Sequence, residues 1–442
     1  MRTNPMGRRS FLRLAGGAGL AAALGPVLSA CSSGDDTSDS PWNGELQFVG
    51  WDFQPDTIKR LVKAWSDANG TPVNVQTIPN VGYSAALQTR LRGGDTIDVF
   101  YNFAYNTQKF IDQKWAVELN GLPDVDTMVN EMFPSARERH VNADGKIISA
   151  PYFSAVYMNQ YNKAYVERAG FTAPPASLAE TYQQAKKIKA DGICDTPYVA
   201  YWIKEFCEEY LNVYLLAQGV TPFDEKGEPV FADDPKAEEA FAWWQSMYTE
   251  GLAPKSLLND DPGKLSGELA QGRAAFFVLH HYLLTSVRDL KGPQSANIEQ
   301  APVVNGQTLQ IGEVLQLGSK SAQAKEKAWQ LMKHYGWKDT EGKFSVFTEW
   351  AKAGGLAAPY PAFFTDPATT AAFPDYYDLS KLSQTFESGS NVVPARTLPW
   401  YPDFQAKVGD LVHAMLLGQA EPKATVAALA DAARKAKAGG GL

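Results

Sequence analysis

The sequence has few of the residues on which most metal and nucleophilic centres depend. Only three of its 442 residues are cysteine and five are histidine. Neither a Gly-x-Ser-x-Gly elbow, a His-Glu-x-x-His motif nor a phosphate-binding P-loop occurs in it. The cysteine spacing fits no zinc or redox motif. We therefore expect no metal and no cofactor, and the usual catalytic constellations are absent.

Long apolar runs are also missing. The run from Leu14 to Leu28 has 15 residues with four glycines and a proline, whereas a membrane-spanning helix needs about 20 apolar residues. It follows an Arg-Arg pair within RRSFLRL, which fits a twin-arginine export signal. The run closes with LSAC, which resembles a bacterial lipobox ending at Cys31. We expect residues 1–30 to be a signal peptide and Cys31 to carry a lipid.

The segment after this cysteine has no apolar side chain to order it. It reads SSGDDTSDS, so residues 31–41 are expected to be a flexible tether. Two acyl chains on the cysteine would make the anchoring stable. The sequence thus predicts a soluble body on a short tether at the outer face of the cytoplasmic membrane.

Positive charge is scarce in the rest of the chain. Residues 1–30 hold four arginines and no acid, so 37 basic residues remain against 49 acidic ones, a net charge of −12. Such a surface disfavours a nucleic-acid partner. Roughly 410 residues exceed what one hydrophobic core normally serves, which suggests two lobes.

Two cysteines remain after Cys31, namely Cys194 and Cys207. An extracytoplasmic compartment permits a disulfide between them, which would stabilise the fold by about 3 kcal/mol in the chain-entropy model. Two unpaired, buried thiols are the alternative, and the sequence leaves both open.

Strand and helix patterns alternate between residues 45 and 102. ELQFVGW, PVNVQTI and IDVFYN are β-rich, and the segments 55–70 and 82–94 between them have helical apolar spacing. This β-α-β-α-β order predicts an α/β fold with a parallel sheet. Ligands of such sheets bind beyond the carboxyl ends of the strands, here the segments 51–53 and 102–105.

Further helices have recognisable starts. Ser177 and Glu180 form a capping box, Asp234 precedes a proline, and Ser321 begins another helical pattern. Two more helices are expected near the end of the chain, at about 403–417 and 424–437. The pattern contains no internal repeat.

Several fragments resemble one protein family. The most specific is DGKIISAPYFSAVYMNQYNKAYVERAGFTAPPASLAE. LRGGDTIDVFYN and QKWAVELNGL precede it in the chain, and ELAQGRAAFFVLHHY, NGQTLQIGEVLQLGSKSAQAKEKAWQLMKHY and the segment from Pro394 to Trp400 follow it. The chain resembles the extracellular solute-binding proteins of ATP-binding-cassette (ABC) importers, in the carbohydrate-type cluster that includes maltose-binding protein. The extra prolines around Trp400 and the pair His280-His281 depart from the family pattern, which concerns the ligand more than the fold.

The resemblance implies a periplasmic-binding-protein-like fold. Two α/β lobes would be joined by hinge crossovers, with a ligand cleft between them. The crossovers are expected near Pro151, near Pro302 and near Gly354-Gly355. The first lobe would comprise residues 42–150 with 303–353, and the second residues 151–302 with 354–442.

A neutral, hydroxylated ligand needs flat apolar faces and a few fixed hydrogen-bonding groups. Positions after a strand or at a crossover give these candidates: Trp51, Asp52, Phe53, Asn102, Tyr105, Tyr152, Tyr201, Trp202, Glu205, His280, His281, Tyr282, Glu313 and Trp400. The family places a stacking tryptophan at Trp400, so we expect Trp400→Ala to weaken binding at least tenfold; the alternative is a hydrophobic anchor beside a helix. Trp51 fits the site and the core of a lobe equally well.

A metal site finds little support. Adjacent residues of a strand point to opposite faces, so His280 and His281 would not easily hold one ion. Tyr376 and Tyr377 resemble the paired tyrosines of ferric-iron-binding relatives, but a surface loop is the expected place for PDYYD.

The resemblance implies a carrier and not an enzyme. A lipid-anchored, monomeric binding protein would capture a sugar, oligosaccharide or polyol and deliver it to ABC permease subunits in the membrane. One alternative is a secreted glycan hydrolase, for which two carboxylates would suffice. The other is a binding protein for a polyamine or ferric iron.

Overall fold

The computed structural model describes residues 42–260, 262–301, 307–318, 322–391 and 393–439. The expected signal peptide 1–30, the lipidated Cys31, the tether 31–41 and the crossover near Pro302 lie outside these residues. Within the described part, none of the helices is both long enough and apolar enough to span a bilayer. The chain folds into two α/β lobes, each built on one sheet.

The first lobe contains a five-stranded mixed sheet. Its strands run in the order β2 (Val73–Ile78), β1 (Leu46–Trp51), β3 (Val99–Asn102), β10 (Val314–Leu317) and β4 (Ala150–Pro151). β1 pairs in parallel with β2 and β3, whereas β10 pairs antiparallel with β3 and β4. The predicted β-α-β-α-β unit is confirmed, and the carboxyl ends of its three strands meet at one edge of the sheet.

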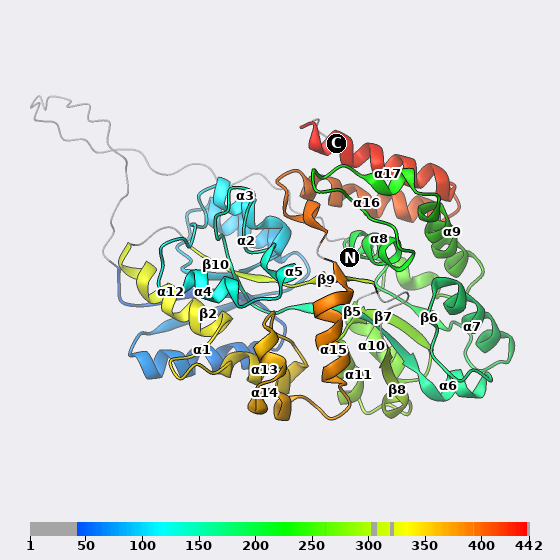
Figure 1. Ribbon diagram of the computed structural model, residues 1–442, viewed down its shortest axis with the longest axis horizontal. Helices are drawn as coiled ribbons and strands as arrows, with labels where there is room; N and C mark the ends of the chain where they lie inside the picture. Colours follow the sequence, from blue (N-terminus) through cyan, green and yellow to red (C-terminus); the bar gives the residue numbers. More distant parts are fainter. Residues whose placement is uncertain (1–41, 261, 302–306, 319–321, 392, 440–442) are drawn as a thin grey trace, which may run out of the picture. The chain divides into compact units, whose positions relative to one another are not determined.

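The helices of this lobe bury the faces that the sequence spacing predicts. α1 (Pro55–Asn69) packs on β2, and Gly70 ends it in a left-handed conformation. The buried side chains of α1 are Ile58, Leu61, Val62 and Trp65. The remaining helices are α2 (Tyr83–Arg92), α3 (Thr107–Asp112), α4 (Val125–Asn130), α5 (Pro134–Arg137), α12 (Ala322–Gly336) and α13 (Ser345–Gly354). α12 packs on β10 and β4, and α13 lies beside α1 and α12 (Figure 1).

The second lobe contains a six-stranded sheet around one long, buried strand. The order is β11 (Ser390–Asn391), β9 (Thr308–Ile311), β5 (Ala155–Asn162), β7 (Phe276–His280) and β6 (Tyr198–Val199), and β8 (Ile298–Ala301) also pairs with β5. All residues of β5 are buried. It is antiparallel to β7, β8 and β9.

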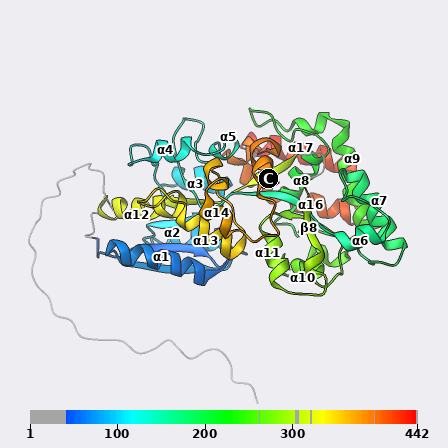
Figure 2. The ribbon, with the colours of Figure 1, turned by 60° about the horizontal axis from the view of Figure 1, so that its bottom comes forward.

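The helices of the second lobe include a tightly packed group. α8 (Cys207–Ala217), α9 (Pro235–Thr249), α16 (Tyr401–Leu416) and α17 (Pro422–Lys437) contact one another and stay together in both views (Figures 1 and 2). The others are α6 (Lys163–Arg168), α7 (Leu178–Ala190), α10 (Pro262–Ala270), α11 (Leu283–Asp289) and α15 (Leu379–Gln384). α14 (Pro367–Ala372) instead packs against α13.

The expected helix starts that fall within the described residues are found close to the expected positions. Ser177 Oγ accepts a hydrogen bond from Glu180 N, and Glu180 Oε2 accepts one from Ala176 N, so a capping arrangement opens α7. Asp234 caps α9 through Lys236 N. α16 and α17 begin two residues before the expected positions. Ser321 lies outside the described residues.

α8 is unusual because every one of its residues is buried, Glu208 and Glu209 included. A buried carboxylate is costly unless it is paired and hydrogen-bonded. Arg396 provides the pairing from a short 3-10 turn, η8 (Pro394–Thr397). Its Nη2 lies 3.1 Å from Glu208 Oε2 and 3.4 Å from Glu209 Oε1. The cluster thereby fixes η8 against α8.

Three chain segments that pass between the lobes hydrogen-bond to one another. Tyr152 N, between β4 and β5, donates to Glu313 O, between β9 and β10 (2.8 Å), and Ser154 N donates to Ala357 O (2.8 Å). Gly312 has no room for a side chain, since a Cβ there would lie 2.7 Å from a carbonyl oxygen of the first segment. The three segments therefore form one compact connection.

The position of the second crossing differs from the expected one. β9 pairs with β5 in the second sheet, so the chain crosses at Gly312 and Glu313, later than Pro302. The predicted limits place residues 303–311 in the first lobe, whereas the pairing with β5 holds β9 in the second sheet. Proline breaks a strand but does not by itself mark a crossing. The other lobe limits, at 150/151 and 353/354, stay a prediction.

Cys194 and Cys207 are both free and buried. Of the two alternatives left open by the sequence, the structure has the unpaired thiols. Cys207 Sγ lies 3.5 Å from Trp202 O. Burial raises the pKa of the Cys194 thiol to about 11 and that of Cys207 further, so neither thiol is disposed to react.

Candidate ligand-binding site

A cavity of about 520 Å³, here called the main pocket, lies between the strand ends of the first lobe and the second lobe. From the first lobe it is lined by Trp51, Asp52, Phe53, Asn80, Val81 and Phe103, which follow β1, β2 and β3. From the second lobe it is lined by Tyr201, Phe206, Glu209, His280 and Tyr282, among others. The connection contributes Tyr152, Phe153, Ile311, Glu313 and Leu356. Both lobes and the connection thus form its wall.

Aromatic rings supply much of this wall. Phe103 is stacked between Trp51 and Tyr105, with ring centroids 5.4 Å apart in both pairs. Across the pocket, Tyr282 stacks on His280 at 5.4 Å with an interplanar angle of 16°, and Phe53 meets the Tyr282 ring edge to face at 6.0 Å. The pocket therefore offers flat apolar faces from both lobes.

Carboxylates form the second class of lining group. Asp52 is exposed, and its Oδ1 accepts a hydrogen bond from Asn80 N at 3.0 Å. Glu209 is buried, and its carboxylate accepts a hydrogen bond from the hydroxyl group of Tyr157. Burial alone would raise the pKa of Glu209, but the nearby His280, Arg396 and Tyr157 hold it at about 2. Glu209 is therefore ionised at any working pH.

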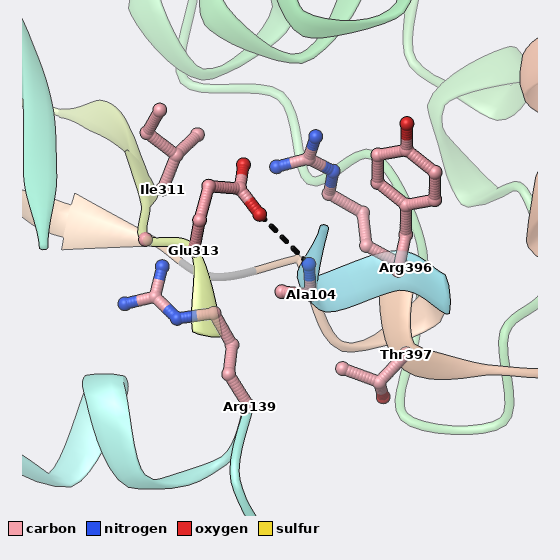
Figure 3. A pocket seen from close by; sticks show the side chains of 8 residues that line it. Ala104, Arg139, Ile311, Glu313, Arg396 and Thr397 are labelled. Carbon is pink, nitrogen blue, oxygen red and sulfur yellow. Dashed lines mark hydrogen bonds between the residues drawn. The ribbon is translucent and has the colours of Figure 1, made fainter. Parts of the chain in front are cut away.

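Glu313 occupies the second crossing and is also buried. Its Oε2 accepts a hydrogen bond from Ala104 N at 2.8 Å, which ties the connection to the 3-10 turn η1 (Ala104–Asn106) after β3 (Figure 3). Burial raises the pKa of Glu313 to about 7, and Glu209 adds to this. The Ala104 N–H and the arginines Arg396 and Arg139 act in the opposite direction. Glu313 thus titrates near neutral pH.

A much smaller cavity, of about 10 Å³, lies behind Glu313. Arg139 and Arg396 lie on opposite sides of Glu313 in Figure 3. Tyr105 also lines this cavity, and burial lowers the pKa of Arg139 to about 9 despite the favourable effect of Glu313. The cavity has room for about one water-sized group, so it does not form a binding site by itself.

A third hollow, a groove of about 870 Å³, is larger than the main pocket. It is lined by polar, charged and aliphatic residues such as Gln108, Asp144 and Leu398, and none of its described lining residues is aromatic. Small-molecule sites combine apolar or aromatic walls with a few placed polar groups. We therefore take the main pocket as the candidate site.

The structure brings eight of the predicted site residues to the main pocket, from β1, the connection and the second lobe. They are Trp51, Asp52, Phe53, Tyr152, Tyr201, His280, Tyr282 and Glu313. Tyr105 lies just behind it, in the small cavity beside Glu313. These residues keep their place in the proposed site.

Three other candidates are buried in the protein core and do not line the main pocket. Asn102 is fully buried and donates to Gln316 Oε1 at 2.7 Å, which joins β3 to β10. Trp202 is fully buried and donates to Tyr214 Oη at 3.0 Å. His281, next to His280, is enclosed beside Phe386 and accepts a hydrogen bond from Val156 N.

Trp400 and Glu205 also lie away from the main pocket. Trp400 is half-buried at the start of α16, and its ring contacts Phe223 and Tyr401 with centroids 6.0 and 5.7 Å away. This is the hydrophobic anchor beside a helix, the alternative named for this residue. Glu205 is exposed just before α8. In this structure the Trp400 ring packs on Phe223 and Tyr401 and does not line the main pocket, and its stacking role stays a prediction.

The tyrosine pair also differs from expectation. Tyr377 is buried, and its hydroxyl is hydrogen-bonded to Thr285 Oγ1 at 2.9 Å, so PDYYD is not simply a surface loop. Tyr376 stays partly exposed with Arg288 over its ring. Across the described ranges no group of three or more His, Cys, Asp or Glu side chains is placed to hold a metal ion.

Sequence reasoning missed several residues of the pocket wall. Phe103 directly follows β3 and could have been found by the same strand-end rule as Tyr105. Phe206 and Glu209 come from the start of α8, whose continuous burial hides any periodic signal. Arg396 lies in the segment that departs from the family pattern.

Comparisons with known proteins agree with this arrangement. Residues 54–336 match the family model described as bacterial extracellular solute-binding protein. A binding protein of Brucella abortus is 22% identical over 95% of this chain and 97% of its own length. The erythritol/L-threitol-binding protein of Mycolicibacterium smegmatis is 26% identical over 41% of this chain and 44% of its own.

Solved structures show the same fold. The maltose-bound MalE3 of T. maritima has a TM-score of 0.76 at 20% identity, covering 88% of this chain and 99% of that one. A solute-binding protein of Agrobacterium radiobacter K84 in complex with ribitol has a TM-score of 0.74 at 20% identity, covering 89% and 98%. With the family model matching more than half of its length, this chain belongs to the bacterial extracellular solute-binding proteins.

Proposed function

We propose that this protein captures a small polyhydroxylated solute, a sugar, short oligosaccharide or polyol, and delivers it to an ABC permease. The observation that carries the proposal is the main pocket, with aromatic faces from both lobes and hydrogen-bonding groups between them. Its volume lies within the range of roughly 300–1,000 Å³ that small-molecule sites have. The sugars and polyols in the names of the relatives support the same class of ligand.

The protein acts in this proposal as a monomeric carrier without catalysis. A solute that contacts both walls stabilises the form in which the lobes close on it. Membership of a family of binding proteins supports a carrier over a glycan hydrolase.

A thermal-shift panel tests the class of ligand. It contains maltose, glucose, ribitol, mannitol and erythritol, with spermidine and ferric citrate as the competing classes. A ligand at a hundred times its Kd adds about 2.7 kcal/mol to the free energy of unfolding, which gives a clear shift. A shift with spermidine or ferric citrate, and none with any sugar or polyol, would contradict the proposal.

The proposal includes anchoring through a lipid on Cys31 at the outer face of the cytoplasmic membrane, supported by the Arg-Arg pair and the lipobox-like LSAC. Cys31→Ser should move the protein from the membrane fraction to the soluble fraction, because the thiol that carries the acyl chains is lost. Fractionation and immunoblotting measure this. Unchanged membrane association of the serine variant would rule out the anchor.

Tyr282 and Trp400 provide a matched test of the site. Tyr282→Ala removes a ring that faces the pocket from the second lobe, and we expect it to weaken binding of the best panel ligand about tenfold, near 1.4 kcal/mol. Trp400→Ala removes a half-buried ring outside the pocket; it should lower the free energy of unfolding by about 2 kcal/mol and change Kd less than twofold. Isothermal titration and urea unfolding distinguish the two. The reverse pattern would restore Trp400 to the site.

A further inference from the structure

We infer that the main pocket ranks its solutes by charge, so that a polyol carrying an ammonium group binds more tightly than its neutral counterpart, and a carboxylate-bearing one binds least. The inference rests on the proposed function, since it names the kind of polyhydroxylated solute that the same pocket prefers. The structural basis is the carboxylates in the pocket wall. A second observation is that Arg139 and Arg396 are hydrogen-bonded within the protein and do not line the pocket.

The acidic side chains in the wall of the main pocket carry negative charge, only in part for Glu313, whose pKa of about 7 leaves it partly protonated near neutral pH. Asp52, Glu209 and Glu313 reach it from the end of β1, from α8 and from the second crossing. Among its described lining residues there is neither lysine nor arginine. An anionic solute would thus meet repulsion that no lysine or arginine of the described lining offsets.

The two nearest arginines are held away from the pocket by the protein itself. Arg396 Nη2 is engaged by Glu208 and Glu209 at 3.1 and 3.4 Å. Arg139 donates to Gln310 O at 3.2 Å and to Ser154 Oγ at 3.4 Å. Both line the small cavity behind Glu313 (Figure 3) and neither lines the main pocket. They balance part of the negative charge but do not present a free guanidinium to a solute.

A buried polar atom in the same wall makes no hydrogen bond to any described residue and has only a long contact with Glu209. His280 is 6% exposed and lines the main pocket. Its Nε2 has no hydrogen bond within the described chain and lies 3.6 Å from Glu209 Oε2. Buried polar groups are normally satisfied, so an orphan atom at a pocket wall points to a ligand group that completes it. A solute amine or hydroxyl placed between His280 and Glu209 would do so.

The aromatic faces act in the same sense as the carboxylates. Rings of Trp51, Phe53, Phe103 and Tyr282 line the pocket, and the face of an aromatic ring attracts a cation. The same faces give an anion no such attraction. Carboxylates and rings together therefore favour the ammonium form of a solute over its neutral form.

Two sets of matched compounds test the ranking by isothermal titration at low ionic strength. The first set is 1-amino-1-deoxy-D-glucitol, D-glucitol and D-gluconate at pH 7.0. The second is D-glucosamine, D-glucose and D-glucuronate, also at pH 7.0, where most of the amine is protonated and about half of Glu313 is ionised. In the set that binds, we expect the amine to have a Kd at least fivefold lower than the neutral compound, and the acid a Kd at least tenfold higher.

Variants identify the groups responsible. In Asp52→Asn/Glu313→Gln the preference for the amine over the neutral compound should fall at least threefold. Asp126→Asn neutralises an exposed acid of α4 that does not line the main pocket. This control variant should keep the full preference for the amine. Thermal unfolding of each variant verifies that it is folded. The ranking of the compounds in the unmodified protein is a test that does not depend on these variants.

The outcomes separate the two proposals. A neutral compound that binds as tightly as its amine, or an acid that binds more tightly than either, overturns the charge ranking while the capture of a polyhydroxylated solute stands. Failure of all six compounds to bind also overturns the ranking, whichever compound of the thermal-shift panel binds. If the sugars and polyols of that panel fail as well, the proposed function fails with it.

Discussion

Arg396→Met is expected to lower the free energy of unfolding by about 3–5 kcal/mol at neutral pH. The guanidinium is 11% exposed and is the charged partner of two buried carboxylates, Glu208 and Glu209. Methionine preserves much of the side-chain volume but removes the guanidinium from both acids, and Glu209 then keeps the contact with His280 at 3.6 Å. Glu208 would keep only Tyr401 and Asn212 as donors. Chemical unfolding in guanidinium chloride measures the loss.

The loss should depend on pH in a defined direction. Burial already raises the pKa of Glu208 in the unmodified protein, although Arg396 acts in the opposite direction. Without Arg396 we expect the pKa of Glu208 to rise further and that of Glu209 to rise as well. An acid whose pKa is higher in the folded state takes stability away as pH rises through that window. The variant should therefore be closest to the unmodified protein near pH 4 and furthest from it near pH 8.

Two further variants control this experiment. Lys63→Met breaks an exposed pair with Asp67, whose side chains are 72% and 63% exposed, and should change stability by less than about 1 kcal/mol. Adding Glu208→Gln and Glu209→Gln to Arg396→Met should recover part of the loss, because no buried charge is then left unpaired. A single variant as stable as the unmodified protein would show that the cluster does not hold η8 to α8.

Glu313→Gln is expected to stabilise the protein at high pH and to leave it unchanged at low pH. Burial raises the pKa of Glu313 to about 7, from an ordinary value of 4.5. The folded state therefore holds this proton more tightly than the unfolded state between pH 4.5 and 7, and the free energy of unfolding falls as pH rises through that range. Glutamine carries no charge to bury and its amide oxygen can still accept from Ala104 N.

The expected difference is about 3 kcal/mol at pH 8, from a shift of about 2.5 units at 1.36 kcal/mol each. Urea unfolding at pH 4, 6 and 8, for Glu313→Gln beside the unmodified protein, measures it. Glu238→Gln replaces an exposed acid of α9 and should stay within about 0.5 kcal/mol of the unmodified protein at every pH. A difference that is the same at pH 4 and pH 8 would mean that Glu313 does not titrate in this window.

The first sheet could be predicted from sequence because its signals are local. Ile58, Leu61, Val62 and Trp65 recur at helical spacing, and the apolar runs between such segments are short enough for buried strands. Once the strands are known to be parallel, their carboxyl ends share an edge. This places Trp51, Asp52 and Phe53 at the main pocket without any knowledge of the second lobe.

The second wall of the pocket could not be derived in this way. Glu209 reaches it from α8, a helix buried on all sides, where no periodicity tells one face from another. The position of the Trp400 ring depends on its contact with Phe223, a residue distant in sequence. The position of Arg396 depends in the same way on the two acids of α8. Such contacts are decided by tertiary packing, and the residue types alone fit more than one arrangement.

The place of β10 in the first sheet has a consequence for the synthesis of the protein. β10 lies between β3 and β4, although it comes far later in the chain. A ribosome must therefore release more than two thirds of the nascent polypeptide before this sheet can close. Until then β3 and β4 have unpaired edges, which other chains can join. Fragments from premature termination before Val314 should need a holding chaperone to stay in solution.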